Sequence, residues 1–197
     1  MGYTVFIMSA KDLIISLPHP HLRGRSKKVA IFTDQVHKVI ADMKAATLDW
    51  EAGRPHEVGV ALAAVQIDQP LRIIIIRSDF DNKKDKTFAV FINPEIVKKE
   101  GEIGADYEGC LSVQDIYGKV PRYPKIRMKA LDEQGREVRV RAEGFLARVI
   151  QHELDHLKGK LFIDYIEDKP EAFYKLTPAG KLINIPQDEI TKTGIFR

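Results

Sequence analysis

The clearest sign of chemistry in this 197-residue chain is a pair of histidines four residues apart. A glutamate lies beside the first of them, and this spacing is typical of a metal site. They lie in the segment His-Glu-Leu-Asp-His at positions 152–156. In a helix, residues four apart share one face, so His152 and His156 can bind one metal ion with Glu153 beside them. A catalytic centre of this kind usually takes three protein ligands and leaves a position for water. The segment therefore predicts a metal centre that still needs a third ligand.

The helix predicted for residues 142–158 places this segment on its apolar side. At about 100° per residue, the two histidines and Glu153 lie on or beside an apolar arc that contains Phe145 and Val149. They do not lie on the face that carries Gln151, Asp155 and Lys158. A buried carboxylate without a partner is costly, so Glu153 needs a reason to lie there, and a metal ion with its water supplies one. The alternative is a chance pair of histidines on an exposed helix.

Two parts of the chain offer a third ligand. A zincin-like endopeptidase would take it downstream of the helix, where the candidates are Asp164, Glu167 and Asp168. Upstream lies Cys110, the only cysteine of the chain, within Glu-Gly-Cys-Leu-Ser at 108–112. A lone buried cysteine is more often an inert apolar side chain than a ligand. Taken singly, these residues leave both alternatives open.

Three segments, taken together and in order, resemble the signature motifs of the peptide deformylase family. They are Gly-Val-Ala-Leu-Ala-Ala-Val-Gln at 59–66, Glu-Gly-Cys-Leu-Ser at 108–112, and Gln-His-Glu-Leu-Asp-His-Leu-Lys-Gly at 151–159. Members of this family remove the formyl group from N-formylmethionine at the start of new bacterial and organellar polypeptides. Ala61 departs from the pattern, which usually has glycine there, and a methyl group would crowd the strand edge presented to the peptide. The second motif has no use in a zincin, and the intact motifs argue against a non-catalytic relative that only binds nascent chains or ribosomes.

The resemblance implies one divalent metal ion held by Cys110, His152 and His156. It implies Fe(2+) as the physiological ion, with Zn(2+) or Ni(2+) able to replace it. A thiolate and two imidazoles suit a tetrahedral site with room for water. Such an ion lowers the pKa of its water and yields hydroxide as the nucleophile.

The resemblance also assigns the catalytic roles. Glu153 is expected to take the proton of the water as general base and to return it to the leaving amine as general acid. The side-chain amide of Gln66 and the backbone N–H of Leu111 are expected to stabilise the oxyanion. Glu108 is expected to form an orienting ion pair, for which Arg122 is the candidate partner.

The substrate is expected to lie between the first motif and the metal-binding helix. The methionine side chain needs an unbranched apolar slot, for which Val60, Phe145 and Val149 are candidates, although ordinary core positions would explain them equally well. Arg148 lies at the edge of the same helix face or points to solvent. Gly109 is expected to let the backbone turn so that Cys110 faces the metal. The expected substrate-binding residues are Gly59, Val60, Ala61, Gly109, Phe145 and Val149.

The pattern along the chain predicts an α+β fold. Mostly antiparallel strands, at 71–77, 87–96, 125–131 and 136–141, are expected around the central metal-binding helix at about 143–158. An N-terminal helix is expected at about 34–50, capped by Thr33 or Asp34. Residues 1–165 are expected to form one catalytic domain. Residues 166–197 form a tail interrupted by prolines, and we do not expect a separate domain there.

Composition limits the partners of the chain. Lys and Arg exceed Asp and Glu by 31 to 28, so we expect no stable complex with nucleic acid. No apolar run approaches the ~20 residues of a membrane span, and one cysteine excludes an intrachain disulfide. The expected partners are N-formylmethionyl nascent peptides, and a transient ribosome contact is compatible with that role. We expect a monomer in the cytoplasm of a bacterial-type cell, with an organelle as the alternative location.

Overall fold

The structure is a computed structural model that describes residues 9–196. Its α-helices are α1 (Asp34–Ala52), α2 (Gly144–His156) and α3 (Gln187–Thr193). Short 3-10 helices are η1 (Ala10–Leu13), η2 (Pro20–Arg23), η3 (Ala64–Ile67), η4 (Phe162–Tyr165) and η5 (Pro170–Ala172). The strands are β1 (Ala61–Ala63), β2 (Ile73–Arg77), β3 (Phe88–Glu100), β4 (Gly104–Cys110), β5 (Val113–Arg122), β6 (Lys125–Leu131), β7 (Glu137–Glu143), β8 (Phe173–Leu176) and β9 (Leu182–Asn184).

Four consecutive isoleucines hold the five-stranded antiparallel sheet in the middle of the fold. They belong to β2, which lies between β1 and β3 in the order β1-β2-β3-β6-β7. Ile73 and Ile75 pack in the cluster that contains the apolar face of α1, whereas Ile74 and Ile76 pack in the cluster that contains α2. Successive strand side chains point to opposite faces, so this run supplies the core on both sides of the sheet.

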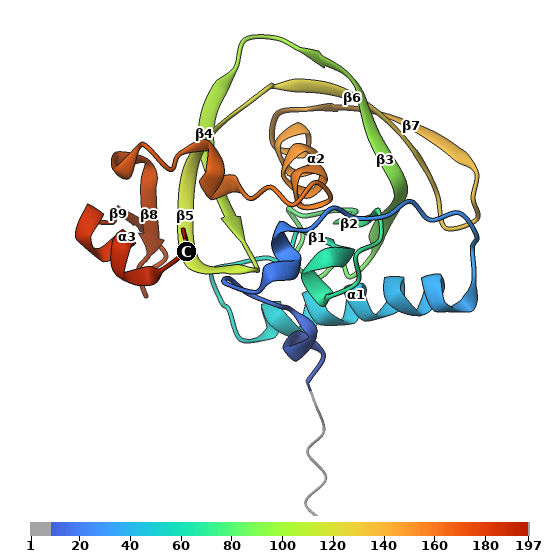
Figure 1. The fold of residues 1–197 in the computed structure, drawn as a ribbon, viewed down its shortest axis with the longest axis horizontal. Coiled ribbons are helices and arrows are strands. Elements are labelled where there is room, and N and C mark those ends of the chain that lie inside the picture. The colour runs from blue at the N-terminus through green and yellow to red at the C-terminus, as the bar shows by residue number, and fades with distance from the viewer. Residues whose placement is uncertain (1–8, 197) are drawn as a thin grey trace, which may run out of the picture.

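Helix α2 lies at the centre of the molecule (Figure 1). The strands β3, β6 and β7 curve over it on one side, and β4 and β5 of a second sheet lie on the other. Every residue from Ala147 to His156 is buried as a result. The α+β fold with antiparallel strands around a central helix is thus confirmed, and so is the capped N-terminal helix, because Thr33 Oγ1 accepts a hydrogen bond from Val36 N.

The second sheet has the order β4-β5-β8-β9 and includes the chain beyond residue 166. Strand β8 pairs with β5 through Tyr117 with Tyr174 and Gly118 with Phe173. The prolines of this segment interrupt no helix: Pro170 begins η5, Pro178 lies between β8 and β9, and Pro186 precedes α3. The C-terminal segment therefore extends the sheet that begins with β4 and β5 (left in Figure 1).

The N-terminal arm, residues 13–32, joins all three motif segments through backbone hydrogen bonds. Ile15 N donates to Gln66 O at 2.8 Å, and Leu17 N donates to Ser112 O at 3.0 Å. Ser26 N donates to Leu157 O at 3.0 Å. The arm thus connects segments that lie far apart in the sequence.

Strand β3 extends to Glu100, beyond the expected end at Ile96. The pairing with β6 shifts register between Ile92 and Glu95, and Asn93 adopts a φ of 52° within this shift. A bulge of this kind removes Pro94, which has no N–H, from the ladder of hydrogen bonds. The strand therefore continues past a proline that a sequence pattern treats as a terminator.

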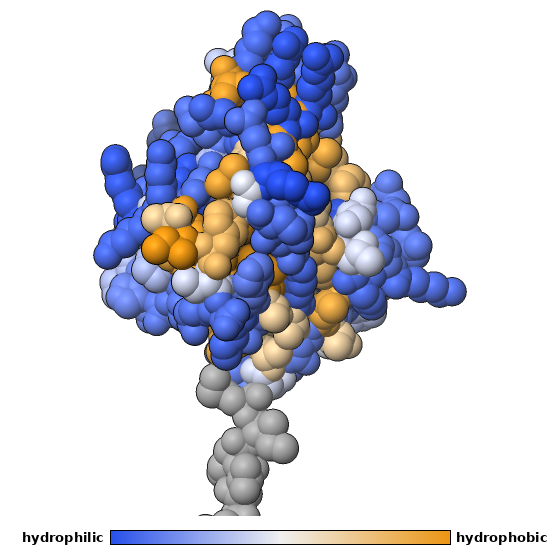
Figure 2. All heavy atoms as spheres, turned by 90° about the vertical axis from the view of Figure 1, so that its right-hand side faces the viewer, coloured by the Kyte–Doolittle hydropathy of each residue, from blue (hydrophilic) through white to orange (hydrophobic). Residues whose placement is uncertain are grey.

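Figure 2 shows the face of the molecule that lies on the right in Figure 1, and this face is mostly polar. Hydrophilic residues cover most of this face, and apolar residues show between them in several groups. None of the helices that the structure describes is long and apolar enough to span a bilayer.

Candidate active site

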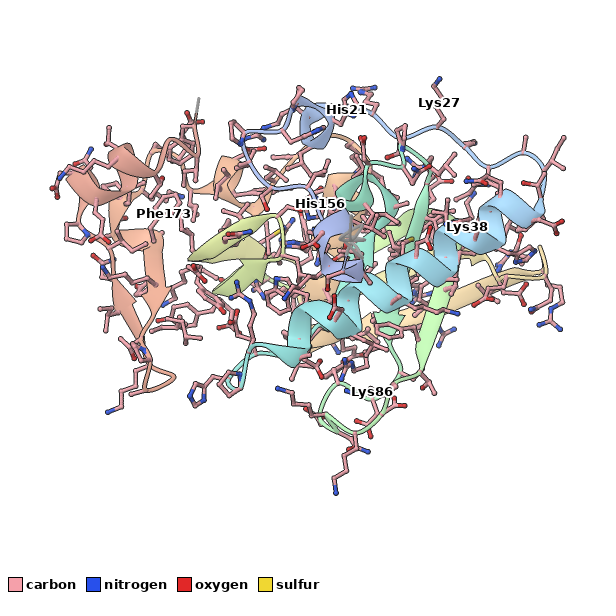
Figure 3. The ribbon with its side chains drawn as sticks, turned by 90° about the horizontal axis from the view of Figure 1, so that it is seen from below. His21, Lys27, Lys38, Lys86, His156 and Phe173 are labelled. Atoms are coloured by element: carbon pink, nitrogen blue, oxygen red, sulfur yellow. The ribbon has the colours of Figure 1, made fainter. Side chains whose placement is uncertain are left out.

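Three buried side chains from two elements converge on one point. Cys110 ends β4, and His152 and His156 lie one turn apart on α2. Sγ of Cys110 lies 3.3 Å from Nε2 of His156, which lies 3.2 Å from Nε2 of His152. The donor atoms of the three residues all lie within 4.8 Å of one another. One thiol and two imidazole nitrogens that face a common point make a donor set suited to a transition metal or zinc, so the residues fit such an ion. Figure 3 shows His156 in the interior, away from the labelled lysines.

Glu108 fixes the orientation of His152. Its Oε2 lies 2.9 Å from Nδ1 of His152, which leaves Nε2 facing the cluster. Arg122 donates to both carboxylate oxygens, from Nε at 2.8 Å and from Nη2 at 3.0 Å. Arg148 Nη1 donates to Oε1 at 2.8 Å. Burial alone would raise the pKa of Glu108, but the hydrogen bonds from His152 and Arg122 outweigh it and lower that pKa to about 2.

The face of α2 outside the apolar arc, which carries Gln151 and Asp155, is also buried. Asp155 accepts hydrogen bonds from Arg122 Nη1 at 2.5 Å and from the Tyr165 hydroxyl at 2.9 Å. Gln151 Nε2 donates to the Tyr123 carbonyl at 2.8 Å. Helical periodicity missed these contacts, because residues from and around the second sheet cover a face that carries polar side chains.

Arg148 is a site residue that sequence reasoning left undecided between the helix face and solvent. It is buried, and besides Glu108 it donates to the carbonyl oxygens of Val120 at 2.7 Å and Gly104 at 3.1 Å. The sequence feature that could have indicated its burial is its place one turn before His152, at the edge of the apolar arc. A charged side chain that is buried there needs a partner. The expected pair of Glu108 with Arg122 is present, and Arg148 completes it.

Glu153 lies beside the convergent donors with one oxygen unpaired. The side chain is 4% exposed, and Oε2 has no hydrogen-bond partner among residues 9–196. Burial raises its pKa to about 7. A carboxyl group in this state can exchange a proton near neutral pH with a molecule in the adjoining cavity.

Gln66 and Leu111 line the same cavity from two other segments. Gln66 lies in η3, and its Oε1 accepts a hydrogen bond from Ala63 N at 2.8 Å. This bond turns the amide nitrogen toward Ser112 Oγ at 3.1 Å and Cys110 Sγ at 3.6 Å. Leu111 follows Cys110 directly and also lines the cavity. Donors from η3 and from the β4–β5 turn thus border the space next to the three convergent side chains.

The cavity has a volume of about 300 Å³ and an apolar end. Val60, Val149 and the half-exposed Phe145 line it, as expected for a side-chain slot. Phe145 also contacts Phe80 edge to face, with ring centroids 5.1 Å apart. Leu182 of β9 lines the cavity as well, a residue that no sequence pattern indicated.

The first motif lies at a sheet edge beside this cavity. Strand β1 pairs with β2 alone within the described chain, and it carries Ala61, which is buried and lines the cavity. Gly59 precedes it, and its N–H donates to Glu51 Oε2 at 3.0 Å. A Cβ atom on Gly59 would lie 2.8 Å from the Thr47 carbonyl oxygen, so the close approach of α1 requires glycine.

Gly109 also has a packing role that the sequence pattern did not indicate. It lies in β4 opposite Tyr117, and an added Cβ would lie 2.6 Å from a ring carbon of that residue. The turn of Cys110 toward the histidines coincides with a register shift in the β4–β5 pairing between Gly109 and Cys110. The glycine thus makes room for the Tyr117 ring.

Of the three downstream carboxylates of the zincin alternative, Glu167 and Asp168 are exposed, and Asp164 is engaged elsewhere. Asp164 accepts two hydrogen bonds of 2.8 Å from Arg23 Nη1, and its Oδ2 accepts one of 2.8 Å from Leu161 N. The third side chain beside the two histidines is that of Cys110.

Comparisons with known proteins agree with this geometry. The family model for polypeptide deformylase matches residues 11–171. The chain belongs to the polypeptide deformylase family. It is 41% identical over 153 residues to peptide deformylase 1 of Ralstonia nicotianae, which covers 78% of this chain and 85% of that protein. It is 43% identical over 161 residues to the peptide deformylase of Mesorhizobium japonicum, covering 81% of this chain and 85% of that one.

Solved deformylase structures share the fold. A peptide deformylase from Legionella pneumophila superposes with a TM-score of 0.70 at 35% identity, covering 92% of this chain and 94% of its own. One from Synechococcus elongatus, in complex with actinonin, gives 0.71 at 33% identity and covers 79% of this chain and 80% of its own. The protein is therefore a metal-dependent hydrolase that deformylates nascent polypeptides. The deformylase family model ends at residue 171, so β8, β9 and α3 lie beyond it.

Proposed function

We propose that this deformylase holds its divalent ion with Cys110, His152 and His156. The observation that carries the proposal is the convergence of one sulfur and two imidazole nitrogens within 4.8 Å. The soft thiolate suits Fe(2+), the ion implied by the family resemblance, and it also suits Zn(2+) or Ni(2+) as replacements. When bound, the ion lowers the pKa of a water molecule toward neutrality and makes it a nucleophile.

Glu153 carries the proton in this proposal. Its buried carboxylate borders the cavity and takes a proton from the attacking water, then returns it to the nitrogen of the departing methionine. The apolar surroundings that raise its pKa to about 7 suit both transfers, because neither protonation state is strongly favoured near neutral pH.

Gln66 and Leu111 stabilise the negative charge that develops on the formyl oxygen. The Gln66 amide is fixed by its bond from Ala63 N, so its N–H groups are oriented before the substrate arrives. The backbone N–H of Leu111 supplies the second donor. Preoriented donors of this kind reduce the barrier because they need no reorganisation during the reaction.

The substrate backbone pairs with the edge of the first motif at Gly59, Val60 and Ala61. An extended peptide can add to an edge strand through main-chain hydrogen bonds. The methionine side chain then enters the apolar end of the cavity between Val60, Phe145 and Val149. Gly109 supports this arrangement through its close approach to Tyr117.

A formate-release assay tests the proposed function. Protein loaded with Fe(2+) without oxygen is expected to release one formate per formyl-Met peptide and to leave unformylated peptides intact. Glu153→Gln is expected to release formate at least about 100-fold more slowly while holding its metal. Cleavage of internal peptide bonds would instead support the zincin reading, and binding of formyl peptides without formate release would support a non-catalytic role.

We further propose the working context of the enzyme. Its substrates are N-formylmethionyl nascent chains, which places it in the cytoplasm or in an organelle that makes such chains, with transient contact at the ribosome. The cavity is built from one chain, so a monomer suffices for catalysis.

A further inference from the structure

A second group of metal-ligating side chains lies on the surface, outside the active site. It consists of His19 and His21 on the N-terminal arm and Asp68 just after η3. The donor atoms that these three residues offer lie within 4.8 Å of one another. Figure 3 shows His21 at the outer edge of the molecule, away from His156 in the interior.

The local backbone explains why the three side chains meet. His19 is the residue before η2 and His21 its second residue, so the tight turn of that helix brings their rings to a centroid distance of 4.9 Å. Asp68 ends η3 with a φ of 58°, a left-handed conformation that aspartate and asparagine tolerate better than most residues. Nδ1 of His21 and Oδ1 of Asp68 are in direct contact.

Hydrogen bonds explain part of the cluster, but they do not require all three side chains to offer donor atoms to one point. Arg23, the other basic side chain of η2, donates two hydrogen bonds to Asp164 rather than to Asp68. A simple pair between His21 and Asp68 would use two of the three side chains. His19 caps η2, because its Nδ1 accepts a hydrogen bond of 3.4 Å from His21 N, and its ring also lies beside that pair. Two imidazoles and one carboxylate are a frequent ligand set for zinc and related ions, with an open position for water.

We propose that His19, His21 and Asp68 form a second, peripheral site for a divalent transition-metal ion such as Zn(2+). The ion would join the arm to the end of η3, the helix that holds Gln66. The arm already reaches this helix through the bond from Ile15 N to Gln66 O. Its role is structural: it fastens the arm across the segment that carries an active-site residue.

Metal stoichiometry tests the proposal directly. Protein without an affinity tag, loaded with Ni(2+) at its centre, is dialysed against micromolar free Zn(2+), and both metals are then measured. Wild type is expected to hold two ions per chain, and the double variant His19→Asn, His21→Asn one. His37→Asn, an exposed histidine on α1, is the matched control and is expected to keep two. One ion in wild type, or two in the double variant, would overturn the proposal.

Asp68→Asn separates a metal site from a plain hydrogen bond. Asparagine tolerates the same left-handed backbone and can still bond to His21, so the local fold is retained. It lacks the carboxylate charge, and we expect the second ion to bind at least about tenfold more weakly. Equal affinity in wild type and Asp68→Asn would mean that Asp68 serves only as a hydrogen-bond partner.

Cobalt(II) and heat supply readouts independent of activity. The second equivalent of cobalt is expected to add visible d–d absorption without further thiolate charge transfer, because Cys110 is the only cysteine. Occupancy at about 100 times the dissociation constant should raise Tm by about 5–10 °C in wild type. This rise in Tm should be absent in the double variant. Its rate of formate release should equal that of wild type, which would show that the variant is folded.

Discussion

Oε2 of Glu108 lies 2.9 Å from Nδ1 of His152, a contact between β4 and α2 that sets which nitrogen of the ring faces the cluster. The same carboxylate, on β4, pairs with Arg122 of β5 and Arg148 of α2, so one side chain links α2 to β4 and β5 of the second sheet. Partners of this kind raise the affinity of a ligand by fixing its tautomer and orientation.

Replacing this carboxylate should weaken the metal centre. In Glu108→Gln the shape is kept and the charge is lost, so we expect metal affinity to fall about 10–100-fold. We also expect the free energy of unfolding to fall by about 3 kcal/mol. This is near the lower end for a broken buried ion pair, because Arg122 keeps its second partner, Asp155. Competition with a chromophoric chelator and denaturant unfolding measure the two effects. Unchanged affinity would mean that Glu108 serves stability alone.

The proposed sulfur ligand has a spectroscopic signature. Wild type loaded with cobalt(II) at one equivalent should show a near-ultraviolet thiolate-to-metal charge-transfer band, because Sγ of Cys110 faces the histidines and would bind the ion. Cys110→Ser should lack that band. Circular dichroism of both proteins controls for folding. Identical spectra from the two proteins would remove Cys110 from the ligand set.

A substitution at Glu153 should lower the rate of the reaction without loss of the metal. Glu153→Gln keeps the size of the side chain but can no longer take a proton, so kcat should fall by about 10²–10⁴-fold. Metal content should remain near that of wild type, and KM should change much less than kcat. Formate release and metal analysis on the same preparation measure both. Loss of the metal would instead make Glu153 a ligand and require a new assignment of the three.

The C-terminal segment should influence the choice of substrate. Leu182 of β9 lines the cavity together with Tyr107 and Trp50, although it lies beyond the region matched by the family model. Leu182→Ala should raise KM about fivefold for formyl-Met peptides of several residues, equivalent to about 1 kcal/mol of lost apolar contact. A formyl-Met dipeptide should be unaffected, because it does not extend that far. Ile183→Ala, a neighbour that is 45% exposed, is the control. Equal KM changes for short and long peptides would contradict the placement.

The elements with strong local patterns could be predicted from the sequence. The hairpin of β6 and β7 around Asp132–Gly135 follows from its turn residues, and α2 follows from its motif and periodicity. The convergent residues could be proposed only because three separate segments resembled known motifs. Spacing within the helix alone gave two ligands and left the third open.

Other features depend on contacts that no local pattern records. The burial of Asp155 arises because Arg122 and Tyr165 approach a helix face that carries polar side chains. The pairing of Tyr117 with Tyr174 joins strands β5 and β8, which are separated in the sequence by β6, β7 and α2. Such long-range arrangements depend on the whole fold and not on local periodicity. The sequence therefore left the burial of Arg148 open and gave no indication that Leu182 lines the cavity.

The backbone bonds of the N-terminal arm have a consequence for how the enzyme is made. The arm is synthesised before its partners Gln66, Ser112 and Leu157, which follow it along the chain. Until Leu157 has emerged, the arm cannot complete its path, and His156 is still missing from the convergent set. An enzyme whose substrates are unfinished chains thus has no working centre while it is itself unfinished.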